Sequence, residues 1–266
     1  MLNASLKDSE FAHFQQMIFR IAGISMSSAK KALVAGRLAK RLKHHGLDSY
    51  EDYFRLLSRQ QDEMQVAVDL LTTNETYFFR EPKHFDFLRD RILSQHPGGR
   101  PFRVWSAACS SGEEPYTLAM LLADKLGDSP WEVLGSDIST HVLEKARRGR
   151  YPTERTQGIP PGLLRTYCLK GVGSQEGHLL IDPALRRRVQ LAQINLNEPL
   201  PDVGEFDVIF LRNVMIYFQT ETKRQVVARL LAKLRPGGVF IIGHSESLNG
   251  LTQGLQNIMP SIYRKP

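Results

Sequence analysis

The chain has 266 residues, enough for one domain of ordinary size and a smaller one. Its net charge of +7 suits a nucleic acid or an acidic protein surface as partner, and charge alone does not choose between them. Two cysteines without a ligand or disulfide pattern, no apolar run near the roughly 20 residues of a spanning helix, and no signal-peptide pattern together favour a cytoplasmic protein without membrane insertion.

Residues 1–73 are predicted to form an all-helical domain, because apolar residues recur there at helical spacing. The three apolar stripes, expected to be core, are Phe11, Phe14, Ile18 and Ile21, then Leu33, Leu38 and Leu42, then Tyr53, Leu56 and Leu57. The second predicted helix has no acidic residue between Lys30 and His45, and its basic residues are Lys30, Lys31, Arg37, Lys40, Arg41 and Lys43. Such a charge run is either a solvated face or a docking surface for an acidic partner.

Residues 74–82 are predicted to link the helical domain to an α/β domain over residues 83–266. The segment Thr72-Thr-Asn-Glu-Thr-Tyr-Phe-Phe-Arg-Glu-Pro82 is polar, then aromatic, and is stopped by a proline. A helix over 83–95 and a turn at Pro97-Gly-Gly-Arg-Pro101 are expected to lead into the first strand.

Residues 103–126 are predicted to form a strand, a tight loop at Gly112 and a helix with Pro115 in its first turn. The loop has a single glycine and two carboxylates, Glu113 and Glu114, so a pyrophosphate would be repelled there. The carboxylates instead suit a positively charged cofactor, such as the sulfonium and ammonium groups of S-adenosylmethionine. The alternative is that both glutamates only favour the helix N-terminus through its dipole.

Further strands are predicted over 131–138, 189–196, 206–213 and 239–243, with helices over 141–148 and 221–234. This alternation predicts a doubly wound, mostly parallel sheet, and the tail over 251–264 is expected to add an antiparallel hairpin. The roughly forty residues between the helix at 148 and the strand at 189 are too many for a simple crossover. We therefore predict a small antiparallel β insertion over about 151–188, with a hairpin near Gly177.

Polar residues follow the predicted strands, and open α/β sheets bind ligands beyond the carboxyl ends of their strands. Asp137 is placed to accept the ribose hydroxyls of a nucleoside, or else to cap the following helix. Asn195 could bond an adenine edge and Asn213 the amino-acid end of a cofactor, with Tyr217 reaching the same cleft. Loop capping by both asparagines and ordinary burial of the tyrosine are the alternatives.

Five motifs follow one another along the chain: Thr73-Asn-Glu-Thr-Tyr-Phe-Phe-Arg-Glu81, Val104-Trp-Ser-Ala-Ala-Cys-Ser-Ser-Gly-Glu-Glu-Pro-Tyr116, Ser136-Asp-Ile138, Arg212-Asn-Val-Met-Ile-Tyr-Phe218 and Gly243-His-Ser-Glu246. Together they resemble the chemotaxis receptor methyltransferase family, CheR, over nearly the whole chain. The resemblance implies a Rossmann-like class I methyltransferase fold. It also implies S-adenosylmethionine-dependent methylation of glutamate side chains on methyl-accepting chemotaxis receptors, giving methyl esters for sensory adaptation and S-adenosylhomocysteine as product.

The resemblance also implies site residues and partners. The positions that match the family's cofactor site are Asn74, Thr76, Arg80, Glu114, Asp137, Asn195, Leu196, Asn213 and Val214, while Arg80 and Tyr217 match the residues proposed to act in catalysis. The glutamate-rich methylation helices of receptors become the expected partner of the basic helix. In some members of the family the insertion docks a receptor's C-terminal tail. We expect a monomer, and no metal, since the eight histidines match no common ligand spacing.

The chemistry agrees with the residues independently of the resemblance. A glutamate carboxylate is ionised at neutral pH and needs no base, so the lack of a catalytic His or Cys constellation is expected. A nucleic-acid methyltransferase is one alternative, but it usually carries Asn/Asp-Pro-Pro-aromatic where this chain has Asn213-Val-Met-Ile-Tyr217. A non-catalytic cofactor-binding adaptor is the other, and the presence of both Arg80 and Tyr217 disfavours it.

Overall fold

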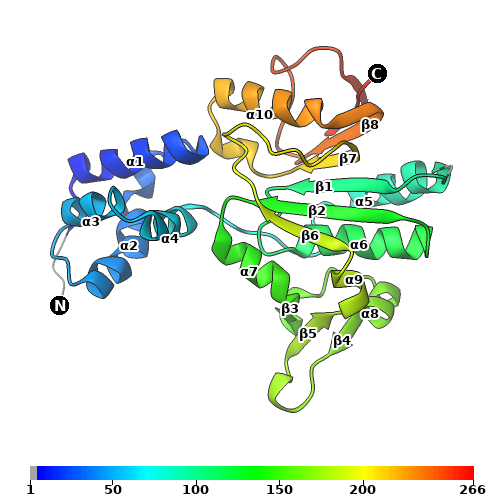
Figure 1. The fold of residues 1–266 in the computed structure, drawn as a ribbon, viewed down its shortest axis with the longest axis horizontal. Coiled ribbons are helices and arrows are strands. Elements are labelled where there is room, and N and C mark those ends of the chain that lie inside the picture. Colours follow the sequence, from blue (N-terminus) through cyan, green and yellow to red (C-terminus); the bar gives the residue numbers. More distant parts are fainter. Residues whose placement is uncertain (1–4, 97) are drawn as a thin grey trace.

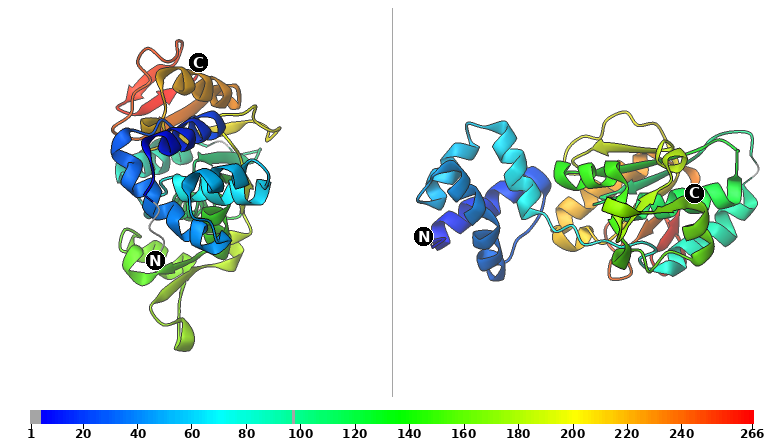
Figure 2. Two further views of the ribbon diagram at one scale, coloured as in Figure 1. Left: turned by 90° about the vertical axis from the view of Figure 1, so that its left-hand side faces the viewer. Right: turned by 90° about the horizontal axis from the view of Figure 1, so that it is seen from below.

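A computed structural model describes residues 5–96 and 98–266, so the first four residues and Pro97 of the predicted turn lie outside it. The chain forms a helical bundle and a larger α/β domain, joined by an extended segment (Figures 1 and 2). The bundle contains α1 (Asp8–Ala22), α2 (Lys31–His45), α3 (Tyr50–Leu57) and α4 (Gln61–Leu71). The all-helical N-terminal domain is thus confirmed.

The bundle encloses one apolar core, built mostly from the predicted stripes. Phe14, Ile18, Leu38 and Tyr53 are fully buried in it. Leu33 is a correction, because it is 41% exposed. The buried stripe of α2 is formed by Val34, Leu38 and Leu42, four residues apart, which places Leu33 on the outer face.

A buried carboxylate ties three helices of the bundle together. Glu63 of α4 accepts two hydrogen bonds from Arg41 of α2, at 2.8 and 2.5 Å, and one of 2.7 Å from the Tyr53 hydroxyl of α3. His45 of α2 lies 3.0 Å from the same carboxylate. Burial favours the neutral acid, but the hydrogen bonds from Arg41, Tyr53 and His45 outweigh it and lower the pKa of Glu63 to about 2. Arg41 is therefore a structural residue of the bundle.

Replacing Glu63 with glutamine is expected to destabilise the protein by about 3 kcal/mol at neutral pH, since Arg41 then loses its counter-charge. The folded-state pKa lies below the usual value of 4.5, so this stabilisation is complete above pH 4.5 and is lost as the pH falls toward 2. Denaturant unfolding should show a deficit that narrows as the pH is lowered from 5 to 3. Asp62→Asn, an exposed change on the same helix turn, should cost only about 0.5 kcal/mol. An equal cost for both variants would contradict the role of Glu63.

The α/β domain is built on a seven-stranded sheet with the order β6-β2-β1-β7-β8-β10-β9. Its strands are β1 (Phe102–Ala107), β2 (Trp131–Asp137), β6 (Val189–Gln193), β7 (Phe206–Leu211), β8 (Leu234–Ile242), β9 (Gln256–Met259) and β10 (Ile262–Arg264). The first five strands in this order pair in parallel, and the last two add an antiparallel hairpin at the edge. The predicted mostly parallel sheet is confirmed.

Helices cover both faces of the sheet, which makes it doubly wound (Figure 1). They are α5 (Pro82–Phe87), α6 (Glu113–Leu126), α7 (Thr140–Arg148) and α10 (Thr220–Ala232). Successive residues of the central strands alternate between two cores: Val104 and Val208 join the core with α5 and α6, while Trp105 and Ile209 join the core with α10. The near-continuous apolar runs of these strands follow from burial on both faces.

Two strands end earlier than predicted. β6 stops at Gln193 and β7 at Leu211, whereas the sequence pattern predicted ends at 196 and 213. The backbone of Asn213 is left-handed, with φ 57°, which takes it out of the ladder. The polar residues beyond both strands therefore belong to loops at the carboxyl edge of the sheet.

The predicted antiparallel insertion is also confirmed. It consists of β3 (Arg150–Pro152), α8 (Pro161–Tyr167), β4 (Cys168–Lys170), β5 (His178–Ile181) and α9 (Pro183–Arg186), with sheet order β3-β5-β4. Gly177, with φ 78°, lies in the connection just before β5, close to the predicted hairpin position.

The bundle docks on the α/β domain through capping contacts. The Asp69 carboxylate of α4 accepts hydrogen bonds from the backbone N–H groups of Thr140 and His141 at the start of α7. The side chain of Asn195 donates to the Ile21 carbonyl at the end of α1, over 2.7 Å. These bonds satisfy helix-end groups that would otherwise lack partners and fix the bundle beside the sheet. Among the helices of residues 5–96 and 98–266, none combines the length and apolar character of a membrane span.

Candidate active site

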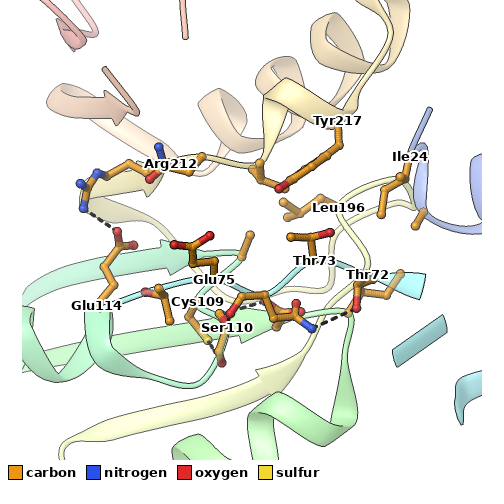
Figure 3. Close-up of a pocket in the computed structure, with 18 of the residues that line it drawn as sticks. Ile24, Thr72, Thr73, Glu75, Cys109, Ser110, Glu114, Leu196, Arg212 and Tyr217 are labelled. Atoms are coloured by element: carbon orange, nitrogen blue, oxygen red, sulfur yellow. Dashed lines mark hydrogen bonds and ion pairs between the residues drawn. The ribbon is translucent and has the colours of Figure 1, made fainter. Parts of the chain in front are cut away.

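A cavity lies at the carboxyl edge of the sheet, and its empty space of about 850 Å³ includes the part that is open to solvent (Figure 3). Strand order reverses between β1 and β7, since β2 and β6 extend the sheet on one side of β1 and β7 and β8 on the other. Chain segments leaving these two strands in opposite directions open a crevice, the usual ligand position in such sheets.

The structure brings all the predicted site residues to this one cavity. The residues that line it among those predicted are Asn74, Thr76, Arg80, Glu114, Asp137, Asn195, Leu196, Asn213, Val214 and Tyr217. They come from the segment between α4 and α5, from the N-terminus of α6, from the ends of β2, β6 and β7, and from the short helix η6 (Met215–Tyr217). Their individual roles remain predictions.

The backbone around the cavity is held in a sparsely populated conformation. Non-glycine residues with a left-handed backbone here are Phe79, Glu81, Ala108, Ser110 and Asn213, with φ between 51° and 68°. Each costs of order 1 kcal/mol or more and persists only where surrounding contacts hold it. Such strain is concentrated at functional sites in proteins, which supports a functional role for this cavity.

Arg212 is the central charged group at one end of the cavity. Its guanidinium, 2% exposed, donates to Glu114 over 2.8 Å and to Glu81 over 3.0 Å, and it also donates to the Arg80 carbonyl. Figure 3 shows Arg212 and Glu114 pointing toward each other, with Ile24, Leu196 and Tyr217 toward the opposite end. Burial opposes ionisation of Glu81, but hydrogen bonds from Asn213 and Arg212 together with the charge of Arg212 lower its pKa. This buried cation thus joins the linker to α6.

The two glutamates of the Gly112 loop have different positions. Glu114 lines the cavity, and its second oxygen accepts a bond of 2.6 Å from Ser106 of β1. Glu113 is fully buried outside the cavity lining, where it accepts a bond from Ser111 and lies 3.2 Å from Arg155. Gly112, with φ 95°, is needed at this turn because a side chain there would meet Ala146 and Tyr151. Of the two, Glu114 is the one placed to meet a ligand.

Asp137 is almost completely buried at the end of β2. Its carboxylate oxygens accept backbone hydrogen bonds from Ser110, at 2.8 Å, and Ser139, at 2.9 Å. Burial raises its pKa, and these bonds oppose that rise. The cap of α7 is Ser139, whose hydroxyl accepts from the Val142 N–H, so the alternative role of Asp137 as the helix cap is not what the structure shows. Each carboxylate oxygen retains capacity for a further donor, such as a ribose hydroxyl.

The two asparagines already have protein partners. Asn195 donates to Ile21 and accepts from the Asn197 N–H, in line with the loop-capping alternative, although the residue also lines the cavity. Asn213 donates to Glu81 over 3.1 Å. Tyr217 points into the cavity and is half-buried (Figure 3). Its carbonyl accepts a bond from Ser25, which ties the loop after α1 to this edge.

Several lining residues were missed by the sequence reasoning. Ala22 and Ile24 reach the cavity from the helical bundle, and Thr73, Glu75 and Ser110 line it beside predicted residues. Others of the set are Thr72, Ala108, Cys109, Ile138, Ile194, Arg212 and Phe218. Arg212 had a detectable signal, because an arginine directly after the apolar run 208–211 must find acidic partners when it is buried.

One group of potential metal ligands lies behind Arg212. In the described part of the chain, Glu81, His84 and His244 bring ligand atoms within 4.8 Å of one another. The Glu81 carboxylate is already bonded to Arg212 and Asn213. Burial, followed by the charge of Arg212, lowers the pKa of His84 to about 3. The guanidinium charge beside this carboxylate disfavours a cation, and the expectation of no metal stays a prediction.

The chemistry of the cavity lining fits S-adenosylmethionine. Glu75, Glu114 and Asp137 are carboxylates that could meet the positive charges and the ribose hydroxyls of this cofactor, and Ile138 and Leu196 offer apolar surface for its adenine. Arg212 offsets part of the negative charge, since it is paired with Glu114 on one side and Glu81 on the other.

Comparisons with known proteins agree with this geometry. The family model "CheR methyltransferase, all-alpha domain" matches residues 9–72, and "CheR methyltransferase, SAM binding domain" matches residues 74–263. Chemotaxis protein methyltransferase 2 of Pseudomonas aeruginosa is 41% identical over 257 residues, covering 96% of this chain and 92% of the relative. The chemotaxis protein methyltransferase of Escherichia coli is 42% identical over 252 residues, covering 93% of this chain and 87% of the relative. The chain therefore belongs to the CheR methyltransferase family and is a methyltransferase with S-adenosylmethionine as its cofactor.

Proposed function

We propose that this protein methylates glutamate side-chain carboxylates of methyl-accepting chemotaxis receptors, giving glutamate methyl esters. The chain belongs to a family whose named relatives are chemotaxis protein methyltransferases, which supports a methylated substrate in the chemotaxis pathway. The observation that carries the proposal is that Arg80 and Tyr217 line the same cavity, while its described lining contains no histidine or lysine. A nucleophile that is already ionised at neutral pH suits a site of this kind.

The cofactor, when bound, supplies an electrophilic methyl group on its sulfonium. The guanidinium of Arg80 is a donor for charge-assisted hydrogen bonds to the substrate carboxylate, and the Tyr217 hydroxyl is a donor for its second oxygen. Together they would aim one carboxylate oxygen along the line of the departing sulfur, which is the main requirement for this transfer. A bond that is too tight would stabilise the ground state, so Arg80 acts chiefly by orienting.

The direct test is incubation of the protein with methyl-labelled S-adenosylmethionine and receptor-containing membranes. We expect base-labile label in the receptor fraction, because carboxylate esters hydrolyse in alkali. A receptor whose methyl-accepting glutamates are replaced by alanine is the matched control and should remain unlabelled. Label in nucleic acid, or no label in the receptor, would refute the proposal.

The structure narrows the basic surface proposed to meet the acidic receptor helix. Arg41 is bonded to Glu63, and Arg37 donates to the Leu70 and Thr72 carbonyls. Lys31 is paired with Asp8 over 2.6 Å. The exposed basic residues in and just before α2 are Lys30, Lys40 and Lys43. The proposed docking face is therefore the outer side of α2 around Leu33, Lys40 and Lys43.

Reversing Lys40 and Lys43 to glutamate is expected to raise the KM for receptor about tenfold and to leave the affinity for S-adenosylmethionine unchanged. Each reversal exchanges an attraction for a repulsion at an exposed site, worth about 0.5–1 kcal/mol. The difference should shrink at high salt. Lys125→Glu on α6 is the control, and it should leave both constants unchanged. Unchanged receptor KM in the double variant would exclude this face.

A further inference from the structure

The first residues of the β insertion touch both the linker and the Gly112 loop. Arg155 donates to the Thr76 carbonyl over 2.7 Å, and the same nitrogen lies 3.2 Å from the Glu113 carboxylate. Gly158 packs so closely on the linker that a Cβ there would lie 2.4 Å from the Phe78 carbonyl oxygen. The insertion therefore abuts the segment that carries Thr76 and Arg80 into the cavity.

A second set of contacts fixes the root of the insertion. The Tyr151 ring packs edge-on against Phe78, with ring centres 4.9 Å apart, and its hydroxyl donates to the Ser111 carbonyl over 2.7 Å. Tyr151 and Phe78 are both buried. The linker and the Gly112 loop are thus held from the same element, with Arg155 spanning them on the solvent side.

The buried Glu113 carboxyl adds an electrostatic contact to this bridge. The side chain is 0% exposed, and within the described part of the chain its Oε1 atom has no hydrogen-bond partner. Burial raises the pKa of this carboxyl, while Ser111 and then Arg155 oppose that rise. A nearby cation stabilises a buried carboxylate with one hydroxyl partner, and Arg155 reaches it from the solvent side.

We propose that Arg155 is a positioning residue for the methyltransferase site. By joining Thr76 to Glu113 it holds the linker against the Gly112 loop, and so holds Thr76 and the backbone that leads to Arg80 at the cavity. The inference rests on the proposed roles of Thr76 and Arg80 but not on the identity of the methylated substrate.

The exposure of Arg155 separates this role from a purely structural one. Its side chain is 46% exposed, and contacts of exposed arginines contribute little to folding stability. Its loss should therefore change the site more than the fold. Arg150 is also in the insertion, and its guanidinium donates a hydrogen bond of 2.6 Å to the Gln175 side chain. This bond does not involve the linker, so Arg150 offers a matched control.

The test compares Arg155→Ala, Arg155→Lys and Arg150→Ala in the full chain. For Arg155→Ala we expect S-adenosylmethionine, measured by calorimetry, to bind about 10-fold more weakly. We also expect kcat at saturating cofactor to fall. The thermal midpoint should fall only slightly, because water can reach the Glu113 carboxyl once the half-exposed Arg155 side chain is shortened. Arg155→Lys keeps the charge on a shorter side chain without the planar guanidinium, so its affinity should be intermediate. Arg150→Ala should behave as the unmodified protein.

Adding Glu113→Gln completes the test. Removing the buried charge should recover part of the affinity lost in Arg155→Ala, because the amide no longer needs a cation. Unchanged affinity and kcat in Arg155→Ala would overturn the proposal, and so would an affinity loss matched by an equal loss in Arg150→Ala. Binding of the cofactor is measured without receptor, so failure of the glutamate-methylation proposal would leave this result interpretable.

Discussion

Replacing Arg80 with alanine is expected to lower kcat for receptor methylation by about 10³-fold or more, with the fold retained. The expected loss corresponds to removal of a positioned, charge-assisted contact to the reacting carboxylate. Arg80 is half-buried, and its side chain donates to the Glu75 carbonyl over 2.9 Å and lies over the Tyr77 ring, both in its own segment. The shortened side chain should leave the linker backbone in place, since Arg212 holds the Arg80 carbonyl.

The measurement is kcat at saturating cofactor and receptor, together with the affinity for S-adenosylmethionine, because Arg80 is also a predicted cofactor contact. We expect Arg80→Lys to lose about 10- to 100-fold in kcat, since lysine keeps the charge but not the planar fork. Arg91→Ala, an exposed change on the π-helical turn after α5, is the control. Near-normal methylation by Arg80→Ala would remove this residue from the mechanism.

Replacing Arg212 with leucine is expected to destabilise the protein by about 3–5 kcal/mol, the usual cost of removing one partner of a buried ion pair. Arg212 is the shared counter-charge of Glu81 and Glu114, which are about one-seventh exposed or less. Without it, two carboxylates remain together in a poorly solvated site. A loss of this size should lower the thermal midpoint by about 10 °C for a domain of this length. Binding of S-adenosylmethionine should be lost as well, because Glu114 and the linker move.

A second substitution distinguishes this charge effect from simple loss of packing. Glu81→Gln in the Arg212→Leu background removes one of the two unpaired charges and should recover part of the stability. The deficit of Arg212→Leu should also shrink as the pH falls. Arg212 lowers the pKa of Glu81 in the folded protein, so its stabilisation is present above the usual value of 4.5 and declines below it. A double variant that is less stable than Arg212→Leu alone would contradict this explanation.

The fold class and the place of the site were predictable because they depend on local patterns. The apolar runs of β1 and β7 and the helical stripe of α1 are each contained in fewer than 20 residues. The ends of parallel strands must meet at one edge, so Asp137 and Asn213 could be assigned to a common site without knowledge of the packing. The resemblance to the CheR family added the linker residues, which no periodic pattern would have identified.

The basic helix shows where sequence reasoning failed. Its six basic residues look equivalent along the chain, and the sequence analysis treated all six as one charged outer face. Their environments differ because α2 packs on α4: Arg41 meets Glu63, 22 residues away, and Arg37 reaches the carbonyls at the end of α4. Leu33 was assigned to the core for the same reason, since a single stripe did not show which side of α2 faces its neighbours.

The sequence by itself determined the α/β architecture, the helical domain, the insertion and part of the cavity lining, since these follow from periodicity, turn chemistry and matched motifs. Only the tertiary structure decided how the charges pair. Arg212 meets Glu81 across 131 residues and Glu114 across 98, and Arg155 meets Thr76 across 79. Such partners are chosen by burial: a charge removed from water must be satisfied by whichever group the packed backbone brings within reach, and no local pattern carries that information.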